Sequence, residues 1–558
     1  MDTIIGIDLG TSTTEAAVYQ DGKPVLMLNF DGREVTPSIV GVDDTGNIIV
    51  GEKAEAQLLI APERTVREVK RLIGTDELVM IGKRQYSPVE ISAMILSYVR
   101  TYAGTYLGED ITRAVISVPA YFDEIQRQET MEAGRAAGFM VDRIINEPTA
   151  AALSYGLEHM DEESYVLVYD LGGGTFDVTL LEMFEGVLEV KASSGDNKLG
   201  GKDFDERLIQ YLTNRFQEKH GIDLTKDLYA MARVRDEALR CKIALSTQEE
   251  YTIQLPVLTV KDEVPYAMDE VLTRAKFEEL IQDLVERTHE PIKVVLSDSG
   301  ISAGELDRIL LVGGSTRVPL VRRDIEAYFD KKPEAAVDPD YAVAQGAAIQ
   351  AAIISGLIDE SSEIVMTDVN PYTLGVRAIH GYDDEYMSVI IPRNKTIPTT
   401  KKQKFYTSWD GQTEAVIEVY QGESSCVRYN HCIGEFVLKG IPDRAAGKEA
   451  IDVSFTYNQN GMLHVTGKIV STGKEASIEI NMLGTKEERE DVSDWKSSEL
   501  AGEYRSAVRR AEKWLKNHAE DKRAEDLLYY LKRAVLEEDE EQAEEFEEKL
   551  LYYIGEQQ

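Results

Sequence analysis

Two glycine-rich stretches carry residue types that could bind a phosphate chain together with a cation. Ile4–Tyr19 reads IIGIDLGTSTTEAAVY and Val168–Glu182 reads VYDLGGGTFDVTLLE. Each places an aspartate before a glycine turn and a threonine after it. Successive backbone N–H groups in such a turn bind anions, and glycine lets the backbone approach a ligand closely. An aspartate beside phosphate requires a cation between them, and Mg²⁺ suits carboxylate, water and phosphate oxygens.

Apolar, β-type segments flank both glycine turns, so each is expected to form a strand–turn–strand hairpin. One such match could be an ordinary turn, but two in the same context favour two hairpins that hold a polyphosphate from both sides. No GxxxxGK[ST] motif is present, which excludes a P-loop enzyme. Leu311–Pro319, LVGGSTRVP, is a third strand-to-glycine turn that leads towards a helical segment and could contact phosphate or sugar.

Length and composition bound the class of protein. At 558 residues the chain is expected to form three or more domains. A formal charge of −39 argues against nucleic acid as the main partner. Three scattered cysteines, an N-terminus without a basic leader, and the lack of an 18-residue apolar run predict a soluble, cytoplasmic protein that spans no membrane.

The pattern along the chain predicts three zones. Up to about residue 358, strand-like runs such as AVISVPAYF and RILLVGGST alternate with helical runs such as EIQRQETMEAGRAAGF, which indicates α/β layering. From Asn370 to about Leu483, short alternating strands and the hairpin signal NQNG predict an all-β sandwich. From Thr485 onward the spacing is helical, as with Tyr504, Val508, Ala511 and Leu515.

These motifs resemble the seventy-kilodalton heat-shock (DnaK-type) chaperone family. The matching stretches are GIDLGTST, VKRLIG, VISVPAYFDEIQRQ, INEPTAAALSYG, YDLGGGTFDV, GDNKLGGKDFD, LVGGSTRVP and DPDYAVAQGAAIQAA, followed by TDVNPYTLGV, NKTIPT, VYQGE and GMLHVTGK. The resemblance fades after about residue 484. The short length and the wording around the linker look most like the HscC-type branch.

The resemblance implies a multidomain fold and an ATPase coupled to peptide binding. A two-lobed, actin-like α/β ATPase domain of ribonuclease-H-type subdomains is expected over 1–358, with nucleotide in the cleft. A linker over 359–369, an all-β peptide-binding sandwich over 370–484 and a truncated α-helical lid over 485–558 would follow. The implied function is an ATP-dependent chaperone that binds extended apolar segments of unfolded clients, with affinity switched by ATP binding and hydrolysis.

The resemblance also assigns the ATP site residue by residue. Lys70 matches the lysine that contacts the γ-phosphate and the attacking water, and Glu147 matches the carboxylate near the metal and that water; Asp170 and Thr175 complete the catalytic set. Hydrated Mg²⁺ and associated K⁺ would lie among Asp8, Asp170 and Asp177. Phosphate contacts are expected from Gly10, Thr11, Ser12, Thr13, Gly172, Gly173, Gly174 and Thr175.

The adenosine side is implied by the third turn and by the stretch RCKIALS. The matching residues are Lys242, Ser246, Gly313, Gly314, Ser315, Arg317 and Asp340. Leu239 stands where the family usually has a glutamate that touches the sugar. This departure predicts lower nucleotide affinity with the chemistry left in place.

Coupling and partner residues are implied in the same way. Pro119 and Arg127 match a proline switch and an arginine relay, and EIVMTD (Glu363–Asp368) matches the apolar linker whose docking signals the ATP state. Thr367 breaks the apolar run, which predicts weaker docking. Arg143 matches a surface arginine used with J-domain partners; an exchange factor and a monomeric state are also expected.

The resemblance places a peptide pocket at Val376, Phe405, Ala415 and Ile417, and an arch over the peptide at Ile379 and Ser408. Ala415 replaces a larger aliphatic residue and Ser408 is polar, so a different peptide preference is expected. About 74 residues follow Gly484, fewer than the usual lid and tail, which predicts faster substrate exchange.

Two alternatives remain at this stage. A small-molecule kinase of the actin-like superfamily would share the doubled phosphate turns but would need an acceptor site and no β zone. A non-catalytic, actin-like scaffold would need neither Lys70 nor Glu147.

Overall fold

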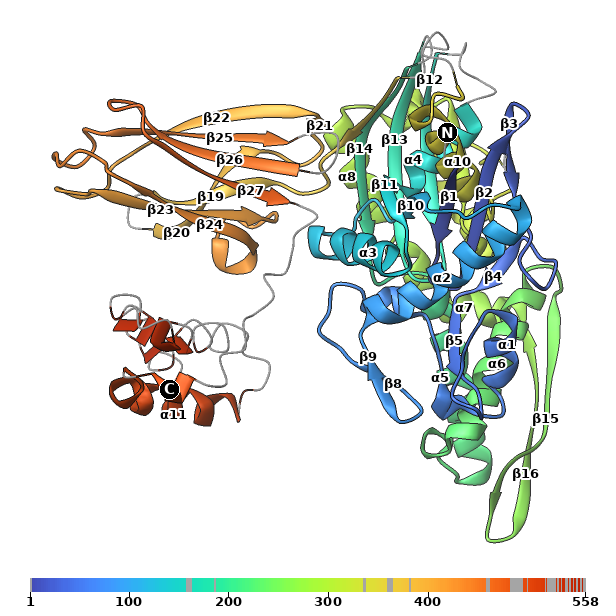
Figure 1. The fold of residues 1–558 in the computed structure, drawn as a ribbon. Helices are drawn as coiled ribbons and strands as arrows, with labels where there is room; N and C mark the ends of the chain where they lie inside the picture. The colour runs from blue at the N-terminus through green and yellow to red at the C-terminus, as the bar shows by residue number, and fades with distance from the viewer. Residues whose placement is uncertain are drawn as a thin grey trace. The chain divides into compact units, whose positions relative to one another are not determined.

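The computed structural model (Figure 1) describes most of the chain. The described residues are 3–156, 163–184, 187–334, 338–358, 365–380, 383–457, 462–481, 495–498, 500–516 and 518, with 528, 531–532, 534–536, 540, 543–544, 546–547, 550–551 and 554 in the C-terminal part. The chain divides into two compact units, Met1–Gly484 and Thr485–Gln558. Within the described residues, no helix is long and apolar enough to cross a membrane.

The first lobe is built on a sheet with strand order β11-β10-β1-β2-β3, with β4 paired to β2. Its elements are β1 (Ile4–Leu9), β2 (Thr13–Gln20), β3 (Lys23–Leu26), β4 (Val35–Pro37), β5 (Ile39–Val42), β6 (Ile48–Val50), α1 (Glu52–Gln57), β7 (Thr65–Arg67), β8 (Val79–Ile81), β9 (Arg84–Tyr86), α2 (Pro88–Leu107), β10 (Arg113–Val118), α3 (Glu124–Ala136) and β11 (Met140–Asn146). The strand predicted over AVISVPAYF ends at Val118, because Pro119 cannot donate a ladder hydrogen bond.

The second lobe repeats this plan with strand order β17-β12-β13-β14-β18-β21. Its elements are α4 (Glu147–Gly156), β12 (Ser164–Leu171), β13 (Phe176–Phe184), β14 (Val187–Asp196), α5 (Gly201–His220), α6 (Leu228–Leu245), β15 (Glu250–Lys261), β16 (Val264–Thr273), α7 (Arg274–Glu286), α8 (His289–Ser299), β17 (Arg308–Val312), α9 (Pro319–Phe329) and α10 (Ala342–Ile354). The predicted strand RILLVGGST ends at Val312, where Gly313 adopts a left-handed φ of 81°.

In both lobes a strand carries its aspartate into a hairpin. β1 pairs antiparallel with β2 and parallel with β10, so Asp8 lies opposite Glu15. β12 pairs antiparallel with β13 and parallel with β17, so Asp170 lies opposite Asp177. The two lobes therefore present the same strand–turn–strand unit, as the sequence predicts.

Helix α10 joins the lobes by very close packing. A Cβ atom added to Gly6 would lie 2.1 Å from the Ala348 nitrogen, and one added to Gly346 would lie 1.7 Å from the Ala150 oxygen. No side chain fits at either glycine, so α10 lies directly against β1 and α4. The apolar cluster here includes Ile4 of the first lobe and Val166 of the second.

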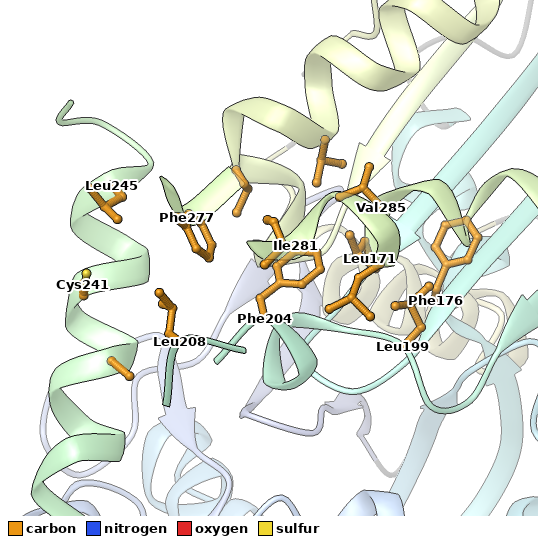
Figure 2. Packing of buried hydrophobic residues seen from close by; sticks show 14 of the residues in the cluster. Leu171, Phe176, Leu199, Phe204, Leu208, Cys241, Leu245, Phe277, Ile281 and Val285 are labelled. Atoms are coloured by element: carbon orange, nitrogen blue, oxygen red, sulfur yellow. The ribbon is translucent and has the colours of Figure 1, made fainter. Parts of the chain in front are cut away.

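The main core of the second lobe anchors its glycine turn. Figure 2 shows Leu171 and Phe176 in one apolar cluster with side chains from α5, α6 and α7. Leu171 and Phe176, which flank Gly172–Thr175, are fully buried. Burial of both flanking residues fixes the ends of the turn on a close-packed core.

A linker strand and a β-sandwich complete the first unit. Strand β18 (Val365–Val369) pairs parallel with β14 and antiparallel with β21. The sandwich sheets have orders β20-β19-β23-β24 and β22-β25-β26-β27. Their strands and the short β21 are β19 (Leu374–His380), β20 (Asp383–Ile391), β21 (Thr396–Ile397), β22 (Thr399–Tyr406), β23 (Glu414–Gln421), β24 (His431–Lys439), β25 (Ala450–Tyr457), β26 (Met462–Ile469) and β27 (Glu475–Asn481).

Strands β25 and β26 pair antiparallel, while the predicted NQNG turn between them lies outside the described residues, as do residues 359–364 of the predicted linker. In the second unit, α11 (Ala501–Leu515) carries the predicted apolar stripe: Tyr504, Val508 and Ala511 are buried, and Leu515 packs against their cluster. The predicted fold class is confirmed: a two-lobed, actin-like α/β region, then a β-sandwich, then helices.

Candidate functional site

The two glycine turns lie against each other. A Cβ atom added to Gly173 would lie 2.2 Å from Ser12 Oγ, and one added to Gly174 would lie 2.6 Å from Thr11 Oγ1. Only glycine lets the second turn approach the first this closely. The structure therefore brings both predicted phosphate-binding turns to one place.

Lys70 lies in a buried ion pair beside these turns. It belongs to a short 3₁₀ helix, Val69–Leu72, and is 5% exposed. Its ammonium donates to Glu147 Oε1 at 2.5 Å and lies 5.7 Å from the centroid of the Phe122 ring. Burial alone lowers the pKa of Lys70, but Glu147, Asp8 and Asp170 raise it overall, so the lysine stays charged.

Two buried aspartates, Asp170 and Asp177, and the half-buried Asp8 surround this pair. Burial, together with the negative charge of Glu147, raises the pKa of Asp8 to about 6 and that of Asp177 to about 7. The same causes raise the pKa of Asp170 well above its usual value. Ser117 Oγ donates to Asp8 Oδ1 at 2.7 Å, and the Tyr121 amide donates to Asp177 Oδ1 at 2.9 Å.

The charge balance of this cluster fits a bound cation. The negative charge of Glu147 raises the pKa values of Asp8, Asp170 and Asp177, while the positive charge of Lys70 lowers them. Among the residues that the structure describes, no three histidine, cysteine or acidic side chains could chelate a metal ion directly. Clustered carboxylates suit Mg²⁺, which usually keeps several waters and is bound through one or two carboxylates together with phosphate oxygens.

The residues predicted to contact adenosine form two adjacent groups. Lys242 donates to Asp205 at 2.9 Å and to the Gly201 carbonyl at 3.1 Å, and Ser315 Oγ donates to the Gly172 carbonyl at 2.8 Å. A Cβ atom added to Gly201 would lie 2.5 Å from Ser315 Oγ and 3.1 Å from Lys242 Nζ. The third turn thus lies directly beside the second.

The second adenosine group surrounds Arg317. Its guanidinium contacts Asp338 at 2.9 Å and Asp340 at 2.7 Å, and Asp340 Oδ1 lies 3.4 Å from a Cβ atom added to Gly314. Ser246 donates to the Lys242 carbonyl at 3.2 Å. Leu239 is half-buried on α6, which also carries Lys242, and Ser246 is the C-cap of this helix.

The predicted relay residues make hydrogen bonds in the first lobe and at the linker. Arg127 donates to the carbonyls of Ala120 at 2.8 Å and of Pro119 at 3.5 Å. Asp368 accepts from Asn146 Nδ2 at 2.8 Å and from the Val369 amide at 2.8 Å. Because Asn146 precedes Glu147, the linker carboxylate lies one residue from the ion pair with Lys70.

The β-sandwich contacts the second lobe and the loop that precedes α3. Arg393 binds Asp298 at 2.7 Å, and the Ser193 amide donates to Asn394 at 3.0 Å. The rings of Tyr121 and Tyr372 lie 4.8 Å apart, and the Tyr372 hydroxyl donates to the Tyr121 carbonyl at 2.8 Å. Tyr121 also holds Asp177, so this contact reaches the carboxylate cluster.

The predicted peptide residues divide by exposure. Val376 and Ile417 are buried in the sandwich core, with Phe405 and Ala415 packed against it. Ile379 is 54% exposed and Ser408 is also exposed. Arg143 is half-buried, and burial lowers its pKa despite the opposing charge of Asp368.

Sequence reasoning missed several supporting residues. Ser38 donates to the Gly10 carbonyl at 2.9 Å and shares a hydrogen bond with Thr14 at 2.9 Å. Glu15 is 2% exposed opposite Asp8, and burial followed by the charge of Asp8 raises its pKa well above its usual value. A glutamate inside an apolar strand was the available signal for Glu15, whereas nothing in the sequence links Ser38 to Gly10.

Comparisons with known proteins agree along the length of the chain. A family model described as "Hsp70 protein" matches residues 4–556. The chain is 45% identical over 536 residues to the chaperone protein DnaK of Thermosipho africanus and to that of Thermosipho melanesiensis, covering 96% of this chain and 88% of each relative. The HscC-type branch stays a prediction. The chain belongs to the Hsp70 family.

Proposed function

We propose a residue-level mechanism for this Hsp70-family protein, an ATP-dependent chaperone that hydrolyses ATP and binds client polypeptides. The observation that supports it is the contact between the two glycine turns, with Ser12 against Gly173 and Thr11 against Gly174, beside the buried Lys70–Glu147 pair. Each lobe contributes one turn. When both turns bind ATP, the binding of its phosphates therefore depends on the relative position of the lobes.

Hydrolysis follows from positioning and charge neutralisation. The turn amides and the hydroxyls of Thr11, Ser12, Thr13 and Thr175 hold the phosphates. Lys70 binds the γ-phosphate and the attacking water, and Glu147 fixes Lys70 and orients that water. Phosphoryl transfer requires little more from a protein than such placement of charges around the transferred group.

Asp8, Asp170 and Asp177 would hold Mg²⁺ through its waters. Mg²⁺, when bound, neutralises charge on the phosphate oxygens. K⁺ is assigned to the same carboxylate cluster. On the adenosine side, Asp340 lies beside the base, and the other nucleoside contacts come from Lys242, Ser246, Gly313, Gly314, Ser315 and Arg317. Leu239 cannot accept a hydrogen bond from the sugar, which lowers affinity.

The linker carries the signal to the β-sandwich. Strand β18 extends the sheet of the second lobe through β14, and Asp368 bonds Asn146 beside Glu147. We assign this docked linker to the ATP state. Pro119 and Arg127 relay the change at the γ-phosphate to the same contact.

The peptide site lies in the β-sandwich, with Val376, Phe405, Ala415 and Ile417 forming the pocket and Ile379 and Ser408 the arch. Arg143 binds a J-domain co-chaperone, and an exchange factor assists ADP release. The domain limits are 1–358, 359–369, 370–484 and 485–558, and the chain acts as a cytoplasmic monomer.

Replacing Lys70 tests the catalytic assignment. Lys70→Ala should lower single-turnover ATP hydrolysis by at least about a hundredfold while ATP still binds. Lys53→Ala is the matched control, because Lys53 is exposed on α1. Hydrolysis that survives in Lys70→Ala would overturn the assignment, and phosphate transferred to a small acceptor instead of water would favour a kinase.

A further inference from the structure

The segment around Lys70 contacts the other lobe through Glu68 and Arg71. Glu68 adopts a left-handed φ of 62°, an uncommon conformation for a residue other than glycine. Its carboxylate lies 2.7 Å from Lys202 of α5 and 3.3 Å from Arg67, and the Glu68 side chain is 17% exposed. Burial alone would raise the pKa of Glu68, but Arg67, Lys202 and Arg71 lower it overall, so the carboxylate is charged.

Arg71 makes a second connection from the same segment. Its Nε and Nη2 atoms donate to the Gly174 carbonyl at 3.0 and 2.7 Å, and its guanidinium forms an ion pair with Asp203. Arg71 and Asp203 are 14% and 24% exposed, which reduces solvent screening of the pair. A planar arginine thus binds the phosphate turn and the first turn of α5 at once.

The start of α5 moves together with that phosphate turn. The Gly201 amide donates to the Gly172 carbonyl at 3.0 Å, and the Lys202 amide donates to the Gly173 carbonyl at 2.8 Å. A Cβ atom added to Gly200 would lie 2.6 Å from the Gly174 nitrogen. Backbone contact at this distance leaves no room for the turn to shift independently of residues 200–203.

We propose that Glu68 and Arg71, with Lys202 and Asp203, form an interlobe clamp that positions the second phosphate turn against the segment of Lys70. This inference rests on the proposed phosphate-binding role of Gly172–Thr175. Separation of the lobes breaks both ion pairs and the bonds to Gly174. An intact clamp therefore slows the release of nucleotide that is held between the two turns. It also keeps the γ-phosphate aligned with Lys70.

Charge reversal of the Glu68–Lys202 pair tests the clamp without changing a residue assigned to the ATP site. Glu68→Lys and Lys202→Glu each replace attraction by repulsion, whereas the double variant restores an opposite-charge pair. Each single variant should speed release of a fluorescent ADP by about fivefold to tenfold and slow single-turnover hydrolysis. The double variant should return the release rate to within about twofold of wild type.

Lys219→Glu is the matched control, because Lys219 lies on α5 and pairs with Glu270 far from the turns. Its ADP release should equal that of the wild type. Singles that release ADP at the wild-type rate, or a double variant no better than the worse single, would overturn the clamp. Wild-type protein that binds no ADP would instead overturn the proposed function, and the role of the clamp with it.

Discussion

Ser38 supports the first glycine turn from within its own lobe, by donating to the Gly10 carbonyl and bonding Thr14. The second turn is supported by the backbone of residues 200–203 and by Arg71, which comes from the opposite lobe. Two turns with nearly the same sequence pattern are therefore stabilised by different parts of the chain. The first turn should behave as a fixed part of its lobe, and the second should respond to the relative position of the lobes.

Gly200→Ala should have the largest effect on ATP affinity, because it disrupts the backbone contacts that support the second turn. Gly200 has an extended φ of −177°, so alanine is tolerated by the backbone there and the effect is steric. Its Cβ would lie within 2.8 Å of backbone atoms of Gly173 and Gly174. Overpacking costs up to about 3 kcal/mol, so we expect ATP affinity, measured by calorimetry, to fall by about a hundredfold.

Gly304→Ala is the control for this substitution, because a Cβ atom added there meets no atom within 4 Å. Unchanged ATP affinity in Gly200→Ala would show that the second turn does not depend on its backbone support.

Ser38→Ala should have a smaller effect, confined to the first turn. The substitution removes the donor to the Gly10 carbonyl and costs about 1 kcal/mol, or about fivefold in ATP affinity. The rate of ADP release should rise by no larger a factor than the factor by which ATP affinity falls, because no interlobe contact is lost. A loss of ATP affinity larger than that in Gly200→Ala would show that the first turn depends on its support more than the second turn does.

Thr367→Val applies the same test to the linker. Like the second turn, the linker strand β18 is held by another part of the chain, because it pairs with β14 of the second lobe. Thr367 Oγ1 is buried and has no hydrogen-bond partner among the described residues. Replacing the hydroxyl by a methyl group removes an unsatisfied polar atom, which should stabilise docking by about 1 kcal/mol. Hydrogen exchange of the β18 amides should slow about fivefold. Thr367→Ser, which keeps the hydroxyl, should leave exchange unchanged; faster exchange in Thr367→Val would contradict the expectation.

The smallest effect concerns pH at the same strand. Burial is the main cause that raises the pKa of Asp368 from 3.8 to about 6 in the docked linker. The docked state therefore binds the proton more tightly than the released linker, so docking is strongest at low pH and weakens as pH rises through about 6. Lowering the pH from 7.5 to 5.5 should favour docking by about fourfold, measured by β18 amide exchange corrected for intrinsic rates. Asp368→Asn should abolish this dependence; a persistent dependence would assign it to another group.

The sequence predicted both hairpins because a strand–glycine–strand pattern is local, and it predicted the three zones because their periodicities differ. Lys70 and Glu147 came from the family resemblance, and the structure brings them within 2.5 Å. Ser38, Arg71 and Asp203 could not be predicted, because their contacts depend on how distant segments meet. In the sequence, Arg71 is only a second cation next to Lys70. Its contact with the Gly174 carbonyl is seen only in the folded structure.

The most direct test of the account is the release of a labelled apolar peptide, followed by fluorescence anisotropy before and after ATP is added. We expect ATP to accelerate release, because docking of β18 joins the phosphate turns to the β-sandwich. The Lys202→Glu variant should require a higher ATP concentration for the same acceleration of peptide release, because the clamp no longer holds the nucleotide. Release that is indifferent to ATP, from protein shown to bind both ATP and peptide, would contradict the coupling between the turns and the sandwich.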